Sequence, residues 1–192
     1  MSPLEVVAAR PEHADALVAF FEASGSTCFC RYWHFAGDKN AWLERAAFSP
    51  EAGQLELRGA LAEKDDSAHG LCAFAGDDIV GWLKLAPLTS LPKLRNLNVY
   101  RRLDLDEKAL AIGCILVRPD HRSQGVSAAL IRGAVEHARS IGAHKLCAFP
   151  RRAEARLHDE EAWMGPYSAY LAEGFVEGPG EDPYPVLVHA LT

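Results

Sequence analysis

The sequence predicts an α/β protein of the α+β kind, in which helices flank a mixed, mostly antiparallel sheet. Residues 110–117 form a continuous apolar run of strand length, which is typical of a buried strand. A segment with helical periodicity starts at Val126, and a second apolar run at 145–149 completes a β-α-β unit. Earlier in the chain, residues 70–85 have the pattern of an antiparallel hairpin.

The first third of the chain predicts one strand followed by helices. A short apolar run at 4–8 is the expected strand. Pro11 suits the first position of a helix, and Gly25 is placed to end that helix. Two further helical segments are expected, at 41–48 and at 55–64. Helices therefore separate the first strand from the hairpin.

The hairpin and the central strand have clear end signals. Gly76-Asp77-Asp78 separates two apolar runs, at 70–75 and 79–85, and a glycine beside aspartates favours a tight turn. Pro119 ends the central strand at 110–117, because proline lacks the N–H group that a sheet ladder needs. These signals place the central strand next in order after the hairpin.

The rest of the chain predicts a helix, a strand, a short helix and a final strand. The apolar face of the first of these helices consists of residues spaced four apart: Val126, Leu130, Ala134 and Ala138. Gly142 is its stop signal. After the strand at 145–149 we expect a helix at 167–173, a turn into extended chain at 174–176, and a strand at 184–191.

The loop before the helix at Val126 has the character of a phosphate site. Small residues open the helix, directly after Gly125. The first N–H groups of a helix lack partners within it, and the helix dipole adds positive charge there. The sequence therefore predicts that the loop and the helix N-terminus bind an anion. The alternative is an ordinary strand-turn-helix in which the glycine only relieves a tight bend.

The spacing Arg122-x-x-Gly125-x-Ser127 resembles the Arg/Gln-x-x-Gly-x-Gly/Ala signature of the GNAT superfamily of N-acetyltransferases. The resemblance covers a longer pattern, from Val117 to Leu130, although Ser127 stands where the family usually has glycine or alanine. In that family the loop holds the pyrophosphate of acetyl-CoA. The resemblance thus implies acetyl-CoA binding by the central strand and the loop, through Ile115, Leu116, Val117, Arg122, Ser123, Gln124, Gly125, Val126, Ser127 and Ala128.

The order of the expected elements is similar to that of the GNAT fold. Two helices, an antiparallel meander, a β-α-β unit and a terminal α-β pair follow the family order over nearly the whole chain. The resemblance implies a single GNAT domain over residues 1–192. A chain of 192 residues with 49% hydrophobic content is long enough to bury a full core, and it has no internal repeats or domain linkers.

The run from Tyr170 to Phe175 resembles the family's Tyr-x-x-x-Gly-Phe element. In many members this tyrosine faces the thioester sulfur and is the general acid. The resemblance implies that Tyr170 protonates the CoA thiolate when the tetrahedral intermediate collapses. The alternative is a ring that packs on a helix face while its hydroxyl reaches water. Tyr167 lies seven residues before Gly174 and does not match the spacing.

No general base is evident. Many relatives carry a glutamate on the central strand at the position that Ala111 occupies here, and no carboxylate lies within 110–117. An acceptor amine that enters neutral, or water that carries its proton to bulk solvent, would make a base unnecessary. We therefore assign no base.

Two segments are candidates for the acceptor site. Three aromatic residues follow the first helix, where GNAT folds commonly place substrate contacts: Tyr32, Trp33 and Phe35. We expect them to line an apolar pocket, and a buried core role for Trp33 is the alternative. The connection at 150–166 is long and typical of a lid, with a short helix expected at 153–162; a solvated helix with paired charges is its alternative.

Composition excludes several classes of protein. A formal net charge of −6 and a pI near 5.7 argue against a nucleic-acid partner. No apolar run approaches the roughly 20 residues of a membrane-spanning helix, so we expect no membrane partner. The N-terminus has no signal-peptide pattern, so a cytoplasmic location is expected.

The five cysteines, an odd number, do not indicate a disulfide scaffold. Three lie in apolar strand-like runs and are expected to be buried small hydrophobes: Cys72, Cys114 and Cys147. Cys28 and Cys30 lie near His34, but a structural zinc site usually needs four ligands and no second pair has suitable spacing. We expect no metal, and packing or acceptor-site lining for Cys28 and Cys30.

Together these features predict an acyltransferase that moves an acetyl group from acetyl-CoA directly to a primary amine of a small molecule. No cysteine or serine lies in a triad-like setting that would favour a covalent intermediate. Two alternatives remain: a non-catalytic acyl-CoA-binding sensor, which Ala111 favours, and a protein or peptide N-acetyltransferase. A homodimer is also left open.

Overall fold

Seven strands form a single sheet in the computed structural model, which describes residues 3–94, 103, 106–153, 157–158 and 161–191. The strands are β1 (Leu4–Ala8), β2 (Gly70–Ala75), β3 (Asp78–Pro87), β4 (Ala109–Val117), β5 (Lys145–Ala148), β6 (Val176–Glu177) and β7 (Leu187–Ala190). Their order across the sheet is β1-β2-β3-β4-β5-β7-β6. Among the strands of these described residues only the β4–β5 pair is parallel, which confirms the predicted mixed, mostly antiparallel sheet with its β-α-β unit.

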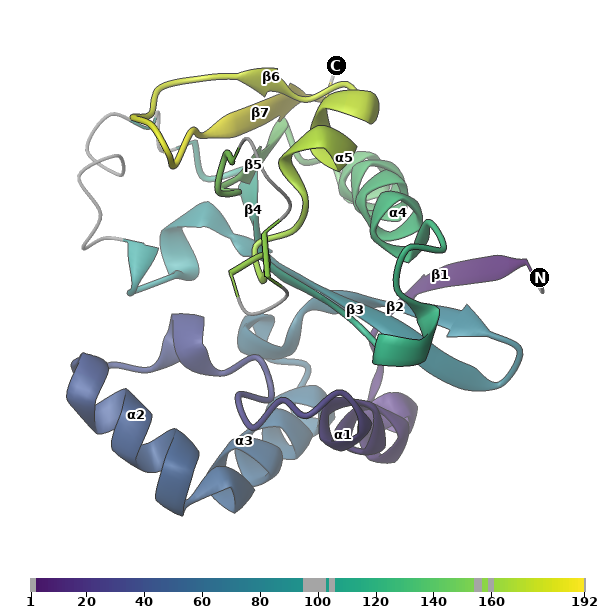
Figure 1. Ribbon diagram of the computed structural model, residues 1–192, viewed down its shortest axis with the longest axis vertical. Coiled ribbons are helices and arrows are strands. Elements are labelled where there is room, and N and C mark those ends of the chain that lie inside the picture. Colours follow the sequence, from purple (N-terminus) through teal and green to yellow (C-terminus); the bar gives the residue numbers. More distant parts are fainter. Residues whose placement is uncertain (1–2, 95–102, 104–105, 154–156, 159–160, 192) are drawn as a thin grey trace.

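Helices cover both faces of this sheet (Figure 1). They are α1 (Ala14–Ala23), α2 (Lys39–Phe48), α3 (Pro50–Ala62), α4 (Val126–Ser140) and α5 (Tyr167–Ala172). α4 and α5 cover one face, where Leu130 and Tyr170 belong to a large apolar cluster. α1 and α3 cover the other face, where Phe21 and Leu57 belong to one apolar cluster with Trp82 of β3. α2 packs on α3 and buries none of its own side chains.

A β-bulge interrupts β4 close to its middle. Leu83 of β3 is opposite Ile115 and Leu85 is opposite Ile112, so β4 carries one more residue than β3 between these pairs. Side chains normally alternate between the two faces of a strand. The extra residue therefore puts Gly113 and Cys114 on the same face, whereas Ile112 and Ile115 both belong to the cluster under α4.

Three expected elements differ from the structure. The helix expected at 55–64 is α3, which starts at Pro50 and ends at Ala62. The final strand starts at Leu187 rather than at Tyr184, because Pro185 has no N–H group for the ladder, and Tyr184 forms only an isolated bridge with Glu181. The expected helix at 153–162 falls partly on residues outside the described part of the chain. The described residues of that stretch are not helical.

None of the helices in the described residues has the length and apolarity to cross a membrane.

A pair of histidines connects α4 to the start of β2. The Nε2 atoms of His69 and His137 are 3.0 Å apart. Burial, then the neighbouring charge of His137 and that of Lys84, lower the pKa of His69 to about 4. Since the unfolded chain has a histidine pKa near 6.5, the unfolded state binds more protons than the folded state as the pH falls from about 6.5 to 4. His69 should therefore cost the fold stability in acid.

We expect the free energy of unfolding to fall by on the order of 2 kcal/mol between pH 7 and pH 4 on account of His69. Urea titrations at several pH values measure it. His69→Gln should make the pH dependence shallower, and the exposed His158→Gln should not. Part of the pH dependence of the free energy of unfolding should remain in His69→Gln, since burial also lowers the pKa of His34, to about 3. Identical slopes for the wild type and His69→Gln would contradict the prediction.

Candidate active site

A cavity of about 700 Å³ lies beside the C-terminal half of β4. One wall is β4, a second is the loop at 121–125 with the first turn of α4, and a third is the segment 165–169. The residues expected to bind acetyl-CoA line it with one exception: Ile115, Leu116, Val117, Arg122, Ser123, Gly125, Val126, Ser127 and Ala128. The exception is Gln124, whose side-chain amide donates to the carbonyl of Asp120 at 2.8 Å. The binding role of these residues stays a prediction.

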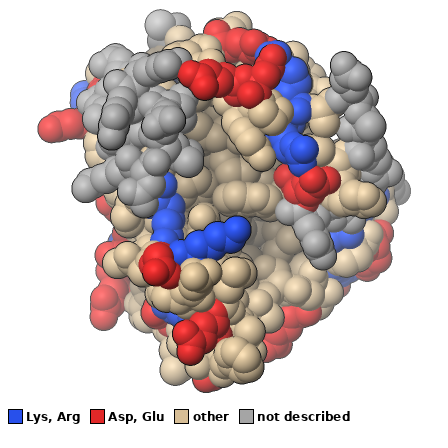
Figure 2. All heavy atoms as spheres, turned by 60° about the vertical axis from the view of Figure 1, so that its left-hand side comes forward, with Lys and Arg blue, Asp and Glu red and all other residues tan. Residues whose placement is uncertain are grey.

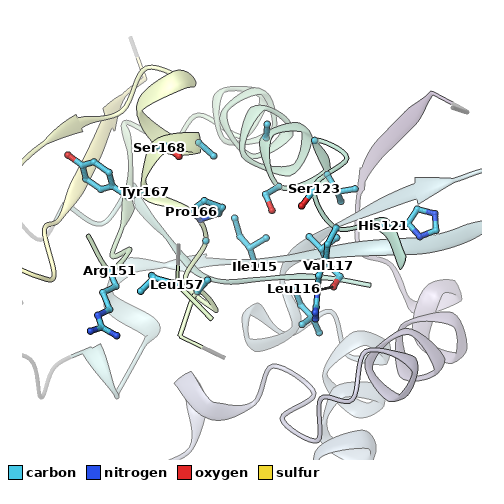
Figure 3. Close-up of a pocket in the computed structure, with 18 of the residues that line it drawn as sticks. Ile115, Leu116, Val117, His121, Ser123, Arg151, Leu157, Pro166, Tyr167 and Ser168 are labelled. Atoms are coloured by element: carbon cyan, nitrogen blue, oxygen red, sulfur yellow. Dashed lines mark hydrogen bonds between the residues drawn. The ribbon is translucent and has the colours of Figure 1, made fainter. Parts of the chain in front are cut away.

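The cavity exists because β4 and β5 separate. Their parallel pairing ends at Ile112 and Ala148, so the edge of β4 beyond the bulge pairs with no strand of the part of the chain that the structure describes. A later segment of the chain partly fills the gap, and the Ile115 N–H donates to the carbonyl of Trp163 at 2.8 Å. In Figure 3 the side chain of Ile115 lies between Pro166 and Ser123, which come from opposite walls.

Gly125 makes the sharp entry into α4. It is the N-cap residue of the helix, with a φ of +82°, a left-handed conformation that side chains rarely adopt. A Cβ built at this position would meet no atom within 4 Å, so the backbone borders open space there. As a glycine it also has no side chain to cap the first N–H groups of α4, which leaves them available to an anion.

Arg118 and Arg122 stabilise the loop. The Arg118 Nε donates to Asp120 Oδ1 at 2.8 Å, and the Arg122 Nε donates to the carbonyl of Val117 at 3.3 Å. Hydrogen bonds from Arg118 and His121 lower the pKa of Asp120 to about 2, so this carboxylate stays ionised. His121, Arg122 and Arg151 line the cavity, and their basic side chains suit an anionic ligand.

Tyr170 lies behind the cavity wall rather than in it. Its side chain is fully buried, and its hydroxyl donates to the carbonyl of Met164 at 2.8 Å. Burial raises the pKa of the phenol above its ordinary value, so it carries its proton at neutral pH. A Cβ built on Gly165, which lines the cavity, would lie 2.8 Å from this hydroxyl, so the hydroxyl is close to the cavity wall. Its role as general acid stays a prediction.

Tyr167 lines the cavity, although its spacing does not match the family element. Figure 3 shows that its hydroxyl points away from Ile115. That hydroxyl donates to the Glu177 carboxylate, which also pairs with Arg152. The hydroxyl of Tyr167 is thus occupied on the side opposite to the cavity.

The residues expected to contact the acceptor form an aromatic cluster with Trp42 and Trp163. Tyr32 makes edge contacts with Trp33, Trp42 and Trp163, at centroid distances of 5.4–6.0 Å. Tyr32, Trp33 and Phe35 do not line the cavity beside β4. Figure 2 shows a hollow on this side of the molecule, with a mainly uncharged floor and with charged side chains on its rim. The acceptor role of the three residues stays a prediction.

Trp33 is a core residue. Its side chain is only 4% exposed, and its indole N–H donates to the carbonyl of Gly113 at 2.7 Å. The space for the ring depends on a glycine, because a Cβ at Gly113 would lie 2.8 Å from the indole. The alternative of a buried role therefore describes its position better than a pocket wall does.

Trp33→Ala should lower the free energy of unfolding by about 3–5 kcal/mol, because it removes a buried ring. Trp33→Phe should cost less, although it leaves the Gly113 carbonyl without its donor, a loss of about 1–3 kcal/mol. Trp163→Ala is the comparison, since that side chain is 39% exposed and should cost less than Trp33→Ala. Urea unfolding measures all three. Equal stability of Trp33→Ala and the wild type would show that the ring contributes little to the core.

One close contact near this site was not predicted from the sequence. The sulfur atoms of Cys30 and Cys114 are 3.1 Å apart, although these residues are 84 positions apart in the chain. No local pattern signals such a contact, and it depends on the bulge that turns Cys114 toward Cys30. The described residues include no group of three or more histidines, cysteines or acidic residues that could hold a metal ion.

Comparisons with known proteins agree with this architecture. The family model described as acetyltransferase (GNAT) family matches residues 31–160, which is more than half of the chain. The chain therefore belongs to the GNAT acetyltransferase family. No curated protein sequence matches it significantly.

Solved structures of low sequence identity share the fold. The PaiA N-acetyltransferase from Thermoplasma acidophilum, solved with coenzyme A, is 13% identical with a TM-score of 0.56, over 98% of this chain and 99% of that one. The GNAT domain of S. lividans PAT is 16% identical with a TM-score of 0.57, over 98% and 90%. YncA from Salmonella typhimurium, a putative acetyltransferase solved with acetyl-CoA, is 15% identical with a TM-score of 0.51, over 98% and 94%.

Proposed function

We propose that the protein transfers an acetyl group from acetyl-CoA directly to a primary amine of a small molecule, and that residues 1–192 form one GNAT domain. The observation that carries the proposal is the cavity beside β4, which joins an open strand edge to the N-terminus of α4. The single seven-stranded sheet supports one domain. Family membership supports the reaction class, and the complexes of PaiA with coenzyme A and of YncA with acetyl-CoA support the donor.

The residues present fit a nucleotide thioester. The α4 N-terminus at Gly125, with the basic side chains of His121 and Arg122, suits a pyrophosphate. Ile115 and Pro166 provide an apolar passage for the less polar arm of the nucleotide thioester. When bound, acetyl-CoA supplies an acetyl group activated as a thioester.

The chain's own groups would guide the transfer. The cavity walls would orient the thioester and exclude water from it, which favours attack by the amine over hydrolysis. The buried phenol of Tyr170 keeps its proton and would donate it to the departing sulfur once a shift of the Met164–Gly165 backbone released the hydroxyl. Ala111 is fully buried on β4, and we assign no base in its place.

A free-thiol assay of CoA release tests the activity. The purified protein is incubated with acetyl-CoA and a panel of amines, amino acids, aminoglycosides and lysine peptides. Thiol release that depends on a small amine supports the proposal, and mass spectrometry of the product should show the acetyl group on nitrogen. Release only with peptides would assign the protein to the protein acetyltransferases instead.

An acyl-CoA sensor without turnover is the second candidate. The engaged hydroxyl of Tyr170 and the absence of a carboxylate on β4 both favour it. A sensor would bind acetyl-CoA in a calorimeter and yet release no thiol with any acceptor. Failure to bind acetyl-CoA at all would contradict both candidates.

A further inference from the structure

Two cysteine thiols from distant parts of the chain meet on the sheet face under α1 and α3, and Cys28 lies two positions before one of them. The Cys30 and Cys114 sulfurs are 3.1 Å apart, within hydrogen-bond range for sulfur. Burial, and then the charge of Cys30, raise the pKa of Cys28. All three are free thiols, and Cys28 and Cys114 are partly exposed. The cluster lies outside the proposed cofactor cavity and has no role in the proposed transfer.

The backbone conformation at both residues fixes the contact between Cys30 and Cys114. The bulge in β4 turns Cys114 toward Cys30. Phe29 and Cys30 have φ values of +44° and +55°, an uncommon conformation that persists only where the surroundings enforce it. Phe29 is 2% exposed, and the Arg31 guanidinium donates to the carbonyl and to the hydroxyl of Ser67, both at 2.8 Å. The two sulfurs are therefore positioned in advance of any reaction.

The surroundings favour a thiolate on Cys30. Lys84 is fully buried, with its ammonium bonded to the carbonyls of Asp66, Ser67 and His69 at 2.9–3.2 Å. Burial raises the pKa of Cys30, but the hydrogen bond from Cys114 and the charges of Lys84 and Arg31 outweigh it and lower the pKa overall. The hydrogen bond with Cys30 and burial raise the pKa of Cys114, which remains the thiol.

Trp82 also lies beside Cys30. Its side chain is fully buried, and its indole N–H has no hydrogen-bond partner within the described residues. An unsatisfied buried donor is costly, and a nearby anion would remove that cost. Trp82 is close enough to the Cys30 sulfur to affect its ionisation. A negative charge on Cys30 would satisfy this donor.

We propose that Cys30 and Cys114 form a reversible disulfide when the protein meets a hydroperoxide. The Cys30 thiolate attacks the peroxide, the O–O bond breaks, and Cys30 becomes a sulfenic acid while hydroxide leaves. Cys114 then attacks the Cys30 sulfur, the S–S bond forms, and the Cys114 proton leaves with the hydroxyl as water. Overall, two thiols and one hydrogen peroxide give one disulfide and two water molecules. The sulfurs must approach by about 1 Å to reach the disulfide length of ~2.05 Å.

The disulfide would connect the segment after α1 to the strand that lines the cavity. Cys114 directly precedes Ile115, and Gly113 already accepts the Trp33 hydrogen bond. Drawing the sulfurs together would shift the bulge beside Ile115. We therefore expect oxidation to lower CoA release reversibly, an effect that rests on the proposed function, whereas formation of the disulfide does not.

Peptide mapping of the full-length protein tests the disulfide. The protein is treated with a small excess of hydrogen peroxide, its remaining thiols are alkylated, and it is digested without reductant. We expect a peptide that links Cys30 to Cys114, with three alkylated cysteines left and full reversal by dithiothreitol. Because the bond closes a loop across 84 positions, the melting temperature should rise by roughly 5–15 °C.

Variants distinguish the Cys30–Cys114 pair from Cys28. Cys114→Ser and Cys114→Ala should both lose the link and the rise in melting temperature, and Cys28→Ser should keep both. A link between Cys28 and Cys30, sulfinic acid on Cys30 without a link, or five unmodified thiols would each overturn the proposal. If the link forms but no amine releases CoA, the disulfide stands and the proposed activity fails. If an amine releases CoA but no link forms, the proposed activity stands and the disulfide proposal fails.

Discussion

Tyr170→Phe should lower the turnover of acetyl-CoA with the best acceptor by about 100-fold, the low end for the loss of a general acid. The substitution keeps the ring in the apolar cluster under α4 and removes only the hydroxyl. Affinity for acetyl-CoA should change little, because Tyr170 does not line the cavity. Steady-state thiol release, together with calorimetry of acetyl-CoA binding, separates the two effects.

The same substitution also tests the purely structural role of Tyr170. The hydroxyl donates to the buried Met164 carbonyl, so its removal should cost about 1 kcal/mol of stability in either case. Tyr184→Phe is the control, since its side chain is 59% exposed and lies outside the cavity. Loss of stability with unchanged turnover would show that water protonates the leaving thiolate and that Tyr170 only holds the 163–165 segment.

Gly125→Val should weaken acetyl-CoA binding by at least tenfold. A side chain there would project into the open space beside the loop, where we propose that the pyrophosphate lies. It would also force a β-branched residue into a left-handed conformation. Calorimetry measures the affinity, and circular dichroism confirms that the variant folds.

Gly142→Val is a matched control for the strain. Gly142 lies just past the other end of α4, also with a positive φ and with no atom within 4 Å of a built Cβ. Both variants should lose stability for the same backbone reason, but only Gly125→Val should lose affinity. Equal affinity of Gly125→Val and the wild type would contradict the assignment of this loop to the cofactor.

Local signals in the sequence predicted most of the elements, because those signals act over a few residues. The spacing from Val126 to Ala138 and the stop at Gly142 both describe α4 well. Pro185 is a local signal as well, and it explains why the final strand starts at Leu187 and not at Tyr184. The family signature also placed the expected cofactor residues, and all of them except Gln124 line one cavity.

The bulge in β4 could not be predicted in this way. Residues 110–117 are apolar throughout, so no alternation shows which side chain changes face. The extra residue is defined only by the pairing with β3. Trp33 illustrates the same limit, because its burial depends on a distant glycine on β4 that leaves space for the indole and accepts its hydrogen bond.

The strand, the loop and the helix that carry Gly125 follow from local signals, since each depends on periodicity, proline and glycine within a short window. Which residues face one another across that loop depends instead on the tertiary structure. The separation of β4 from β5, the return of Trp163 to the open strand edge, and the contact of Cys30 with Cys114 join residues that are far apart in the chain. Such contacts follow from the order and register of the strands, which no short stretch of sequence encodes.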